Sequence, residues 1–346
     1  MKAIVFDQSL PINDENALFE TDLPKPEAKG RDILVRIEAI SVNPIDSKVR
    51  LRALPEKGEP KTLGFDAVGT VVSVGDEVSL FKAGDQVFYA GDVGRPGSNA
   101  EFQLVDERIV GFAPKKASIE DAVALPLTAL TAYEMLFDRL LIDVQPKYVS
   151  QTPILLITGA AGGVGSIMIQ LAKAICPQAT VIATASRTES QAWCEKMGAD
   201  HVIDHHKGIQ SELQSLGIDQ VTHIASLTHT SQHFDDYINI IQPQGKICLI
   251  DDPATPLNIQ ALKMKSVSLH WELMFTRARF ETEDMIKQHH ILIEVANLLD
   301  TGAIQSTRTL TLGAMNVANL KQAHALIESN QTIGKMVLTV ESNHES

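Results

Sequence analysis

The stretch Leu155–Lys173, which reads LLITGAAGGVGSIMIQLAK, constrains the fold more than any other part of the 346-residue chain. A run of apolar residues ends at Thr158, a glycine-rich turn follows, and a pattern of apolar and small residues typical of a helix begins after Gly165. Strand, tight turn and helix in this order are the setting in which a glycine fingerprint binds a dinucleotide. We therefore expect a parallel α/β sheet with a dinucleotide bound at this turn.

Each position of the turn has a distinct physical task. In G-x-G-x-x-G register the letters are Ala160, Ala161, Gly162, Gly163, Val164 and Gly165, so alanine takes the first glycine position. A glycine at 162 lets the main chain approach a pyrophosphate, and one at 165 lets the helix pack closely on the strand. The N–H groups at the helix start face the phosphates, supported by the helix dipole. We predict cofactor contacts at Ala160, Gly162, Gly163 and Val164; the alternative is a turn that only helps to pack the sheet.

The region around this turn alternates between strand and helix patterns. The expected strands are residues 154–158, 180–185, 202–203, 221–225 and 246–250, and the expected helices are 166–175, 189–197, 210–216 and 231–241. A helix-like pattern at 128–137 precedes them. This alternation predicts a doubly wound parallel sheet, the Rossmann architecture, over residues 127–263.

The remaining residues indicate a second, β-rich domain. Short strand patterns at 2–7, 33–42, 67–74, 86–90 and 102–105 are separated by Gly, Pro and Asp turns. After residue 263 the alternation stops, and the tail contains helix patterns at 283–299 and 316–328 and strand patterns at 307–311 and 334–340. We expect residues 264–346 to return and complete the domain formed by residues 1–126.

Composition excludes several classes of protein. The net charge is 30 − 43 = −13, which argues against a nucleic-acid surface. No apolar run approaches the ~18–20 residues that cross a bilayer, and the start reads as a strand rather than a signal peptide. The three cysteines are widely spaced and indicate neither a disulfide framework nor a zinc cluster. A cytoplasmic enzyme that acts on a small molecule, without nucleic-acid or membrane partners, is the expectation.

The end of the second strand of the α/β region indicates which dinucleotide binds. NAD sites usually carry Asp or Glu there to bind the ribose hydroxyls. This chain instead has Ser186 and Arg187, and a guanidinium can pair with a 2′-phosphate. The sequence thus favours NADPH; the alternative is that both residues are solvated at a helix start. His205, which we place at the end of the next strand, is either a further 2′-phosphate neighbour or an exposed histidine.

The nicotinamide end should lie at the carboxyl ends of the later strands, because ligands bind at that edge of a parallel sheet. We accordingly predict cofactor contacts from Leu227, Thr228 and Ile250. Histidines offer little sign of a metal site. His229 and His233 have helical i, i+4 spacing without an evident third partner, and His289 with His290 is expected to be a surface pair.

Several motifs together resemble one family. They are GAAGGVG at the turn, LGFDAVGTVVSVG at 63–75, AGDQV at 83–87, ALPLTALTAYEML at 124–136 and IGKMVL at 333–338. The chain resembles the medium-chain dehydrogenase/reductase superfamily, most closely its quinone oxidoreductase-like branch. SVNPID and LHWELMFTR also resemble the subgroup called zinc-type alcohol dehydrogenase-like proteins. The resemblance implies a GroES-like catalytic domain, a Rossmann domain, an active-site cleft between them and a homodimer.

The resemblance also raises the question of zinc. Zinc members of the superfamily hold the metal with a Cys after an early strand and a His-Glu pair in a GHE-like motif. By resemblance these positions fall on Asn43 and on Gly64-Phe65-Asp66, and phenylalanine cannot ligate a metal. The sequence therefore predicts an enzyme without catalytic zinc.

The resemblance implies three candidate catalytic residues. The Asn43 amide could donate a hydrogen bond to a substrate oxygen as negative charge develops there; its alternative role is structural, in the turn before Pro44. Asp46 is placed near the same cleft, with helix capping as the alternative, and Thr128 is placed near the nicotinamide or its ribose, again with helix capping as the alternative.

These features together predict an NADPH-dependent, zinc-independent oxidoreductase that reduces a quinone or an α,β-unsaturated carbonyl by hydride transfer. Two alternatives stay open. One is a zinc-type alcohol dehydrogenase with ligands that the motifs do not reveal. The other is an NADPH-binding sensor or scaffold with little turnover, because fold alone does not determine function.

Overall fold

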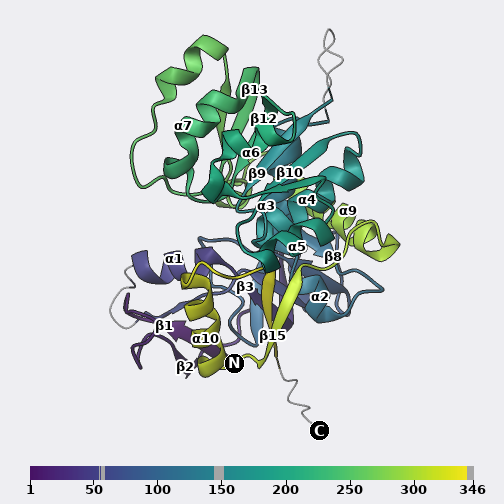
Figure 1. The fold of residues 1–346 in the computed structure, drawn as a ribbon. Helices are drawn as coiled ribbons and strands as arrows, with labels where there is room; N and C mark the ends of the chain where they lie inside the picture. Colours follow the sequence, from purple (N-terminus) through teal and green to yellow (C-terminus); the bar gives the residue numbers. More distant parts are fainter. Residues whose placement is uncertain (54, 56–58, 144–151, 341–346) are drawn as a thin grey trace. The chain divides into compact units, whose positions relative to one another are not determined.

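The computed structural model describes residues 1–53, 55, 59–143 and 152–340. It divides the chain into two compact units (Figure 1). Residues 1–130 and 275–346 make up the first unit, and residues 131–274 make up the second.

The first unit is built around β-sheets. The strands of the larger sheet are β3 (Asp32–Val42), β5 (Asp66–Val74), β6 (Gln86–Tyr89), β7 (Phe102–Asp106), β8 (Val110–Phe112), β15 (Arg308–Ala314) and β16 (Lys335–Thr339). They follow the order β15-β16-β3-β5-β6-β8, with β7 also paired to β3. A smaller sheet, ordered β2-β1-β4, contains β1 (Lys2–Phe6), β2 (Phe19–Asp22) and β4 (Lys61–Thr62). Because β16 pairs antiparallel with β3, the C-terminal residues belong to the sheet of the N-terminal residues.

Short helices surround these strands. They are α1 (Pro44–Arg52), η1 (Glu107–Ile109), α2 (Ile119–Val123), α3 (Pro126–Tyr133), α8 (Thr276–Arg279), α9 (Lys287–Thr301) and α10 (Val317–Glu328). Helix α1 contacts α10, and α9 contacts β8. Helix α3 crosses the division between the units at residues 130 and 131, and a π-helix, η2 (Glu134–Arg139), continues it.

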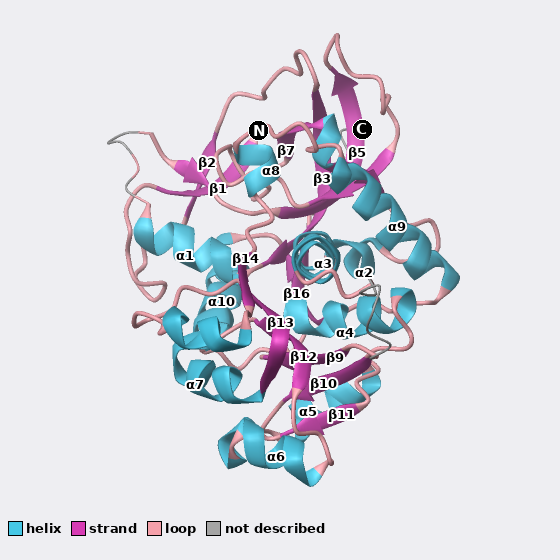
Figure 2. Ribbon diagram, turned by 90° about the horizontal axis from the view of Figure 1, so that it is seen from above, coloured by secondary structure: helices cyan, strands magenta, loops and turns pink. Residues whose placement is uncertain are grey.

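The second unit is a six-stranded parallel sheet. Its strands are β9 (Ile154–Thr158), β10 (Thr180–Thr184), β11 (His201–Ile203), β12 (Val221–Ser226), β13 (Ile241–Leu249) and β14 (Ser268–Trp271). The order β11-β10-β9-β12-β13-β14 reverses direction between β9 and β12, and the six strands lie side by side in Figure 2. In a doubly wound sheet this reversal is the point at which ligands bind. The predicted α/β Rossmann architecture is confirmed.

Helices cover both faces of this sheet. They are α4 (Gly163–Ile175), α5 (Thr188–Lys196), η3 (His205–Lys207), α6 (Ile209–Ser215), α7 (Thr230–Ile240) and η4 (Ile259–Lys265). Figure 2 shows α4 and α7 on opposite sides of the strands. The central strands carry fully buried apolar residues, among them Leu156, Ile182, Ile224 and Ile247, as expected for strands covered on both faces.

The boundary expected at residue 263 differs from the structure. Strand β14 pairs in parallel with β13, so residues up to 274 belong to the α/β unit rather than to the β-rich one. The sequence pattern missed this strand because the connection to it is the irregular 3₁₀ helix η4 instead of a regular amphipathic helix. Strand β13 also begins at Ile241, five residues before the expected start, since a register shift lets it continue through Pro243.

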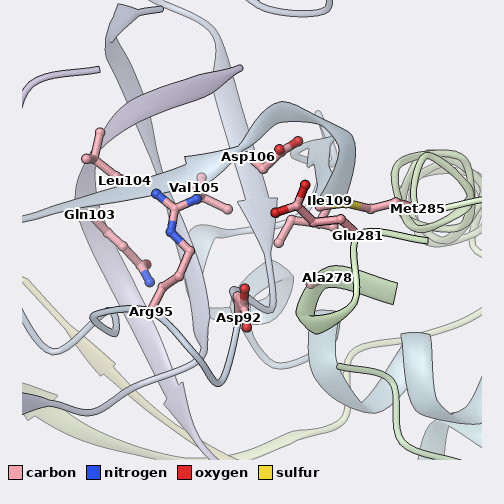
Figure 3. A pocket seen from close by; sticks show the side chains of 10 residues that line it. All are labelled: Asp92, Arg95, Gln103, Leu104, Val105, Asp106, Ile109, Ala278, Glu281 and Met285. Atoms are coloured by element: carbon pink, nitrogen blue, oxygen red, sulfur yellow. The ribbon is translucent and has the colours of Figure 1, made fainter. Parts of the chain in front are cut away.

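The first unit contains a small cavity between β7, η1 and the segment that carries α8 (Figure 3). Its volume of about 60 Å³ gives room for a few water molecules. Figure 3 shows Arg95 and Gln103 on one wall and Met285 on another, and no predicted site residue is among those that line it. Arg95 forms two hydrogen bonds with Asp32, of 2.8 and 2.7 Å, so its charge is already compensated. Among the described residues, no helix is both long and apolar enough to cross a membrane.

Candidate functional site

The glycine turn of the second unit leaves room for a ligand on one side and for close packing on the other. A Cβ added at Gly162 would meet a single atom within 4 Å, the carbonyl oxygen of Gly159 at 3.4 Å. A Cβ at Gly165 would lie 2.4 Å from the carbonyl oxygen of Ala160, which confirms that this glycine lets α4 pack closely on the turn. A Cβ at Gly159, whose φ is +68°, would lie 2.7 Å from Thr228.

The start of α4 fits a pyrophosphate. Gly162 is the N-cap residue in an extended conformation, and the helix begins at Gly163. The first N–H groups of a helix lack partners within it, and the helix dipole makes this end positive. Gly162, Gly163 and Val164 are half-buried, whereas Ala160 is fully buried. Gly163 and Val164 can offer N–H groups to a phosphate, whereas the Gly162 N–H donates to the Gly159 carbonyl at 3.1 Å. Ala160 can shape the turn beneath.

Strand register brings the other predicted contacts to the same edge of the sheet. Ser226 at the end of β12 lies opposite Thr158 of β9 and Leu249 of β13. Leu227 with Thr228 and Ile250 directly follow these strand ends, so they lie at the same edge as the glycine turn, where they are half-buried. The sequence predicts this clustering correctly because the carboxyl ends of parallel strands share an edge.

A buried network of hydroxyl groups, which no local sequence pattern indicates, fixes this edge. The Tyr237 hydroxyl lies 3.1 Å from Thr158 Oγ1 and 2.9 Å from Ser226 Oγ. Ser226 Oγ lies 2.7 Å from Thr230 Oγ1, and the Thr230 N–H donates to Asp251 at 3.0 Å. Burial raises the pKa of Tyr237 to about 12, so the tyrosine stays protonated. The network joins β9, β12 and α7 to the loop after β13.

The residues predicted to select the cofactor lie between β10 and α5. The Ala185 N–H donates to the Ile203 carbonyl at 3.0 Å, which holds the end of β10 level with the end of β11. Ser186 is half-buried, and Arg187 is exposed at the N-cap of α5, where its N–H donates to Ser190 Oγ. The stretch contains no acidic residue before the exposed Glu189. Contact of Ser186 and Arg187 with a 2′-phosphate stays a prediction.

His205 lies in a different element from the one expected. Strand β11 ends at Ile203, and His205 begins η3, because the side chain of Asp204 accepts the His206 N–H and starts a 3₁₀ turn. The His205 ring lies 4.3 Å from that of His206 and 5.8 Å from that of His233, between ring centroids. Burial, followed by repulsion from these two histidines, lowers the pKa of His205. Its Nδ1 atom is buried without a hydrogen-bond partner in the described part of the chain.

The predicted catalytic residues of the first unit lie in a buried polar cluster, which we define as Asn43, Asp46, Asp66 and Lys335. Asn43 Nδ2 donates to Asp66 Oδ2 at 2.8 Å and to the Ser41 carbonyl at 3.4 Å. Asn43 Oδ1 accepts from Lys335 Nζ at 2.5 Å. The amide of Asn43 is thus occupied at both ends, so its donation to a substrate oxygen stays a prediction that requires one of these bonds to break.

Asp46 has the helix-capping geometry that was its alternative role, whereas the Thr128 hydroxyl donates to a carbonyl instead of accepting an N–H group. Asp46 is buried and accepts the Asn43 N–H at 2.8 Å and the Gly64 N–H at 3.0 Å, which caps α1 and anchors the loop before β5. Burial raises the pKa of Asp46 to about 7, although these two N–H groups and Lys335 act in the opposite direction. Thr128 Oγ1 donates to the Leu125 carbonyl at 3.0 Å inside the first turns of α3. Neither arrangement tests their catalytic assignment.

Asp66 and Lys335 are the members of the cluster that are not among the predicted catalytic residues. Asp66 Oδ1 accepts the Leu127 N–H at 2.7 Å and so caps α3, while Oδ2 accepts from Lys335 Nζ at 3.2 Å. Lys335 lies in IGKMVL directly before Met336, Val337 and Leu338, which are all buried. A charged residue inside an apolar strand pattern is the signal that could have indicated a buried ion pair.

The donor set at the positions that the resemblance assigns to zinc does not fit the metal. The Phe65 ring offers no donor and lies 5.1 Å from the ring of Phe275. Asp66 supplies a carboxylate, but its Oδ2 atom already binds an ammonium group. A zinc site needs three or four Cys, His or carboxylate donors around one point. In the described ranges, no group of three such residues is arranged to hold a metal ion.

The expectation that His289 and His290 form a surface pair is half wrong. His290 is exposed, but His289 is buried, and its Nδ1 atom lies 2.6 Å from the Val110 carbonyl. The reason is that α9 packs on β8, which brings this face of the helix into the core.

Family models match both units. The alcohol dehydrogenase GroES-like domain matches residues 29–128, and the zinc-binding dehydrogenase domain matches residues 163–288. The zinc-type alcohol dehydrogenase-like protein of Staphylococcus aureus strain MSSA476 is 41% identical over 340 residues, which cover 98% of this chain and 100% of that protein. The chloroplastic NADPH-dependent alkenal/one oxidoreductase of Arabidopsis thaliana is 32% identical over 246 residues, 68% of this chain and 59% of that protein.

Solved structures agree over nearly the whole chain. A Rhizobium etli CFN 42 protein, provisionally described as a zinc-dependent alcohol dehydrogenase, has a TM-score of 0.95 and 48% identity, with 99% of this chain and 98% of that chain covered. The quinone oxidoreductase of Coxiella burnetii has a TM-score of 0.79 and 26% identity, with 99% of both chains covered.

A GroES-like unit together with a dinucleotide-binding unit defines a class of oxidoreductases. The chain belongs to the medium-chain dehydrogenase/reductase superfamily, in its quinone oxidoreductase-like branch, as its motifs predict.

Proposed function

We propose that the protein is an NADPH-dependent reductase of a quinone or an α,β-unsaturated carbonyl compound and that it works without zinc. The observation that carries the cofactor preference is the end of β10, where Ser186 and an exposed Arg187 stand in place of the acidic residue of NAD sites. The substrate class draws support from two relatives, named an NADPH-dependent alkenal/one oxidoreductase and a quinone oxidoreductase.

The second unit supplies the residues that would hold the cofactor. The first N–H groups of α4 would bind the pyrophosphate, and Leu227, Thr228 and Ile250 would contact the nicotinamide end. Arg187 and Ser186 would bind the 2′-phosphate, and the unpartnered Nδ1 atom of His205 supports a ligand at this edge. When bound, the cofactor supplies the hydride chemistry.

The first unit supplies the proposed catalytic residues. Asn43, Asp46 and Thr128 are proposed to act on the substrate or to position groups that do. Removal of Asn43 or Asp46, which are proposed to act at the substrate, should lower kcat and leave NADPH affinity unchanged. Removal of Thr128, which is proposed to lie near the nicotinamide or its ribose, should weaken NADPH binding as well. Asn43→Asp is the informative change for the amide, because it keeps the side-chain shape and removes the Nδ2 donor.

The test is a titration of the purified protein with NADPH and NADH, combined with metal analysis and a consumption assay on quinones and enones. We expect preferential NADPH binding, turnover of at least one compound class and activity that survives chelation. Tight NADPH binding without turnover would favour the sensor alternative. One zinc per chain with activity lost on chelation would instead support a zinc-type alcohol dehydrogenase.

The proposal includes a cytoplasmic homodimer. Strand β14 lies at the edge of the parallel sheet, and Trp271 on it is 55% exposed, so this edge is open to a second copy. Sedimentation equilibrium should give twice the mass of one chain, and a monomer at micromolar concentration would contradict the dimer.

A further inference from the structure

Four histidines of the second unit lie close together beyond the end of strand β11. We define the histidine cluster as His205 and His206 in η3, His229 at the N-cap of α7 and His233 in the first turn of that helix. The centroid of the His205 ring lies 4.3 Å from that of His206 and 5.8 Å from that of His233. The fold thus gathers imidazole rings from two segments that are separate in the chain.

The histidine cluster lies at the same edge of the sheet as the residues proposed to select the cofactor. Strands β10 and β11 pair in parallel, with Thr184 opposite Ile203. Arg187 comes shortly after the end of β10, and His205 comes shortly after the end of β11, so both lie at the carboxyl edge where a parallel sheet binds ligands. An anion that pairs with Arg187 at this edge is therefore also exposed to the charge of the cluster.

The protein by itself holds His205 in the neutral form at neutral pH. Burial, followed by repulsion from His206 and His233, lowers the pKa of His205, and Asp204 opposes this shift only in part. A charged imidazole has two N–H donors, but the Nδ1 atom of His205 is buried without a partner in the part of the chain that the structure describes. A second proton on this ring is disfavoured by its neighbours and by the missing acceptor.

The other charged groups around the histidine cluster come from three elements. Asp204 caps η3, and its N–H donates to Glu212 of α6 at 3.2 Å. Asp236 lies on α7, where burial lowers the pKa of His233 although Asp236 acts to raise it. Lys207 is exposed at the end of η3. Because burial outweighs the carboxylates at the partly buried rings, an added negative charge can still raise the proton affinity of the cluster.

A phosphate monoester supplies such a charge, since it carries about −1.5 to −2 near neutral pH and an opposite charge nearby favours the protonated form of a histidine. We propose that the histidine cluster makes cofactor selection proton-linked: His205 takes up a proton as the 2′-phosphate of NADPH binds, and the preference for NADPH over NADH therefore increases as pH falls. This inference rests on the NADPH preference in the proposed function, but it does not depend on the substrate.

Proton uptake makes the affinity for NADPH depend on pH. If the pKa of His205 is higher with the phosphate bound than without it, affinity rises as pH falls between the two values, by at most about tenfold per pH unit for one proton. The second pKa of the phosphate is about 6, so this group stays mainly dianionic above pH 7. From pH 8.5 to pH 7 the ratio of NADPH to NADH affinity should rise at least about threefold.

Isothermal titration of the full-length protein measures both quantities. NADPH and NADH are titrated at pH 7 and pH 8.5, and at pH 7 in two buffers of different ionisation enthalpy, which gives the number of protons taken up. We expect uptake of about half a proton or more per NADPH at pH 7 and almost none per NADH. Adenosine 2′,5′-bisphosphate should behave like NADPH, and adenosine 5′-phosphate like NADH, because the proton follows the 2′-phosphate.

His205→Asn removes the titrating ring and keeps a polar side chain. This variant should take up almost no proton with NADPH and lose most of the pH dependence of the preference, while the preference that remains at pH 8.5 depends on Arg187. His201→Asn is the matched control, because it removes a histidine from the other end of β11 and should take up as many protons as the wild type. Equal weakening of both cofactors at both pH values in His205→Asn would show a merely structural role.

Proton uptake by the wild type requires no variant, so it decides the matter even if His205→Asn does not fold. Absence of uptake with NADPH, equal uptake with both cofactors, or unchanged uptake in His205→Asn would overturn the proposal. A preference for NADPH that is equal at pH 7 and pH 8.5 would contradict this inference alone. Absence of any preference at both pH values would contradict the proposed cofactor as well.

Discussion

Arg187 is the residue on which the proposed cofactor preference depends. Its guanidinium can form charge-assisted hydrogen bonds to a 2′-phosphate, which NADH lacks. Loss of hydrogen bonds to a charged group costs roughly 1.5–3 kcal/mol, so Arg187→Ala should weaken NADPH binding about ten- to a hundredfold and leave NADH binding nearly unchanged. Isothermal titration with both cofactors measures the difference.

Lys196 serves as the control for this change, because it lies at the other end of the same helix with its ammonium group 5.2 Å from the Trp193 ring centroid. Lys196→Ala should alter neither affinity. Equal losses for NADPH and NADH in Arg187→Ala would show that the arginine does not select the cofactor.

The titration of Asp46 should make the free energy of unfolding fall as pH rises, whereas a salt-bridged carboxylate makes it rise with pH. Burial raises its pKa from the ordinary 3.8 to about 7, so between these values the folded state binds a proton that the unfolded state has lost. The free energy of unfolding should therefore fall as pH rises from 4 to 7, by at most about 1.4 kcal/mol per pH unit from this group.

Urea unfolding of the wild type and of Asp46→Asn at pH 5 and pH 8 checks the sign. The buried histidines act in the other direction, since burial lowers the pKa of His223 to about 4 and that of His324 to about 3. Comparison with the variant removes their contribution, because both proteins contain them. The wild type should lose more stability between the two pH values than Asp46→Asn does, and equal losses would contradict the raised pKa of Asp46.

At the scale of elements, the stretch that leads from β9 into α4 contains one glycine needed for packing, Gly165, and one proposed to face the ligand, Gly162. Gly165→Val places a side chain against the Ala160 backbone and should lower the free energy of unfolding by about 1–3 kcal/mol or more, as overpacking does. A Cβ at Gly162 would meet only the Gly159 carbonyl oxygen, at an ordinary contact distance of 3.4 Å, so Gly162→Val should keep the melting temperature.

Gly162→Val should nevertheless abolish binding of both NADPH and NADH, because the new side chain fills the space of the pyrophosphate. Differential scanning fluorimetry with and without cofactor measures both effects in the two variants, so each variant serves as the control for the other. Unchanged cofactor affinity in Gly162→Val would show that the turn is not the phosphate site.

At the scale of the whole molecule, strand β16 ties the C-terminal tail to the N-terminal residues. A chain that ends at Gly334 lacks β16, exposes the edge of β3 and leaves the buried Asp66 without its ammonium partner. Breaking a buried ion pair from one side costs about 3–5 kcal/mol, so the first unit should unfold.

The second unit contains no residue of the deleted segment and should keep its parallel sheet. Limited proteolysis of the shortened chain should leave a resistant fragment that spans most of residues 131–274. A wild-type melting temperature with no change in proteolysis would contradict this dependence on β16.

The two units could be predicted from sequence to different extents. The α/β unit follows from periodicity, because residues 154–249 form local strand and helix patterns whose parallel order places Gly159, Leu227 and Ile250 at one edge. The sequence pattern does not predict strand β14, because an irregular segment precedes it. In the β-rich unit, β2, β4 and β8 are too short for their patterns to stand out, and they exist through pairing with distant strands.

The sequence by itself determined the family, the dinucleotide turn and the absence of metal donors at Asn43 and Phe65, since these depend on residue types at fixed local spacing. The tertiary structure alone decided that Lys335 reaches Asn43 and Asp66 across 292 and 269 residues of chain, and that Tyr237 joins Thr158 to Ser226. The packing of strands that are distant in sequence determines which buried polar groups form hydrogen bonds with one another. No local pattern encodes that choice.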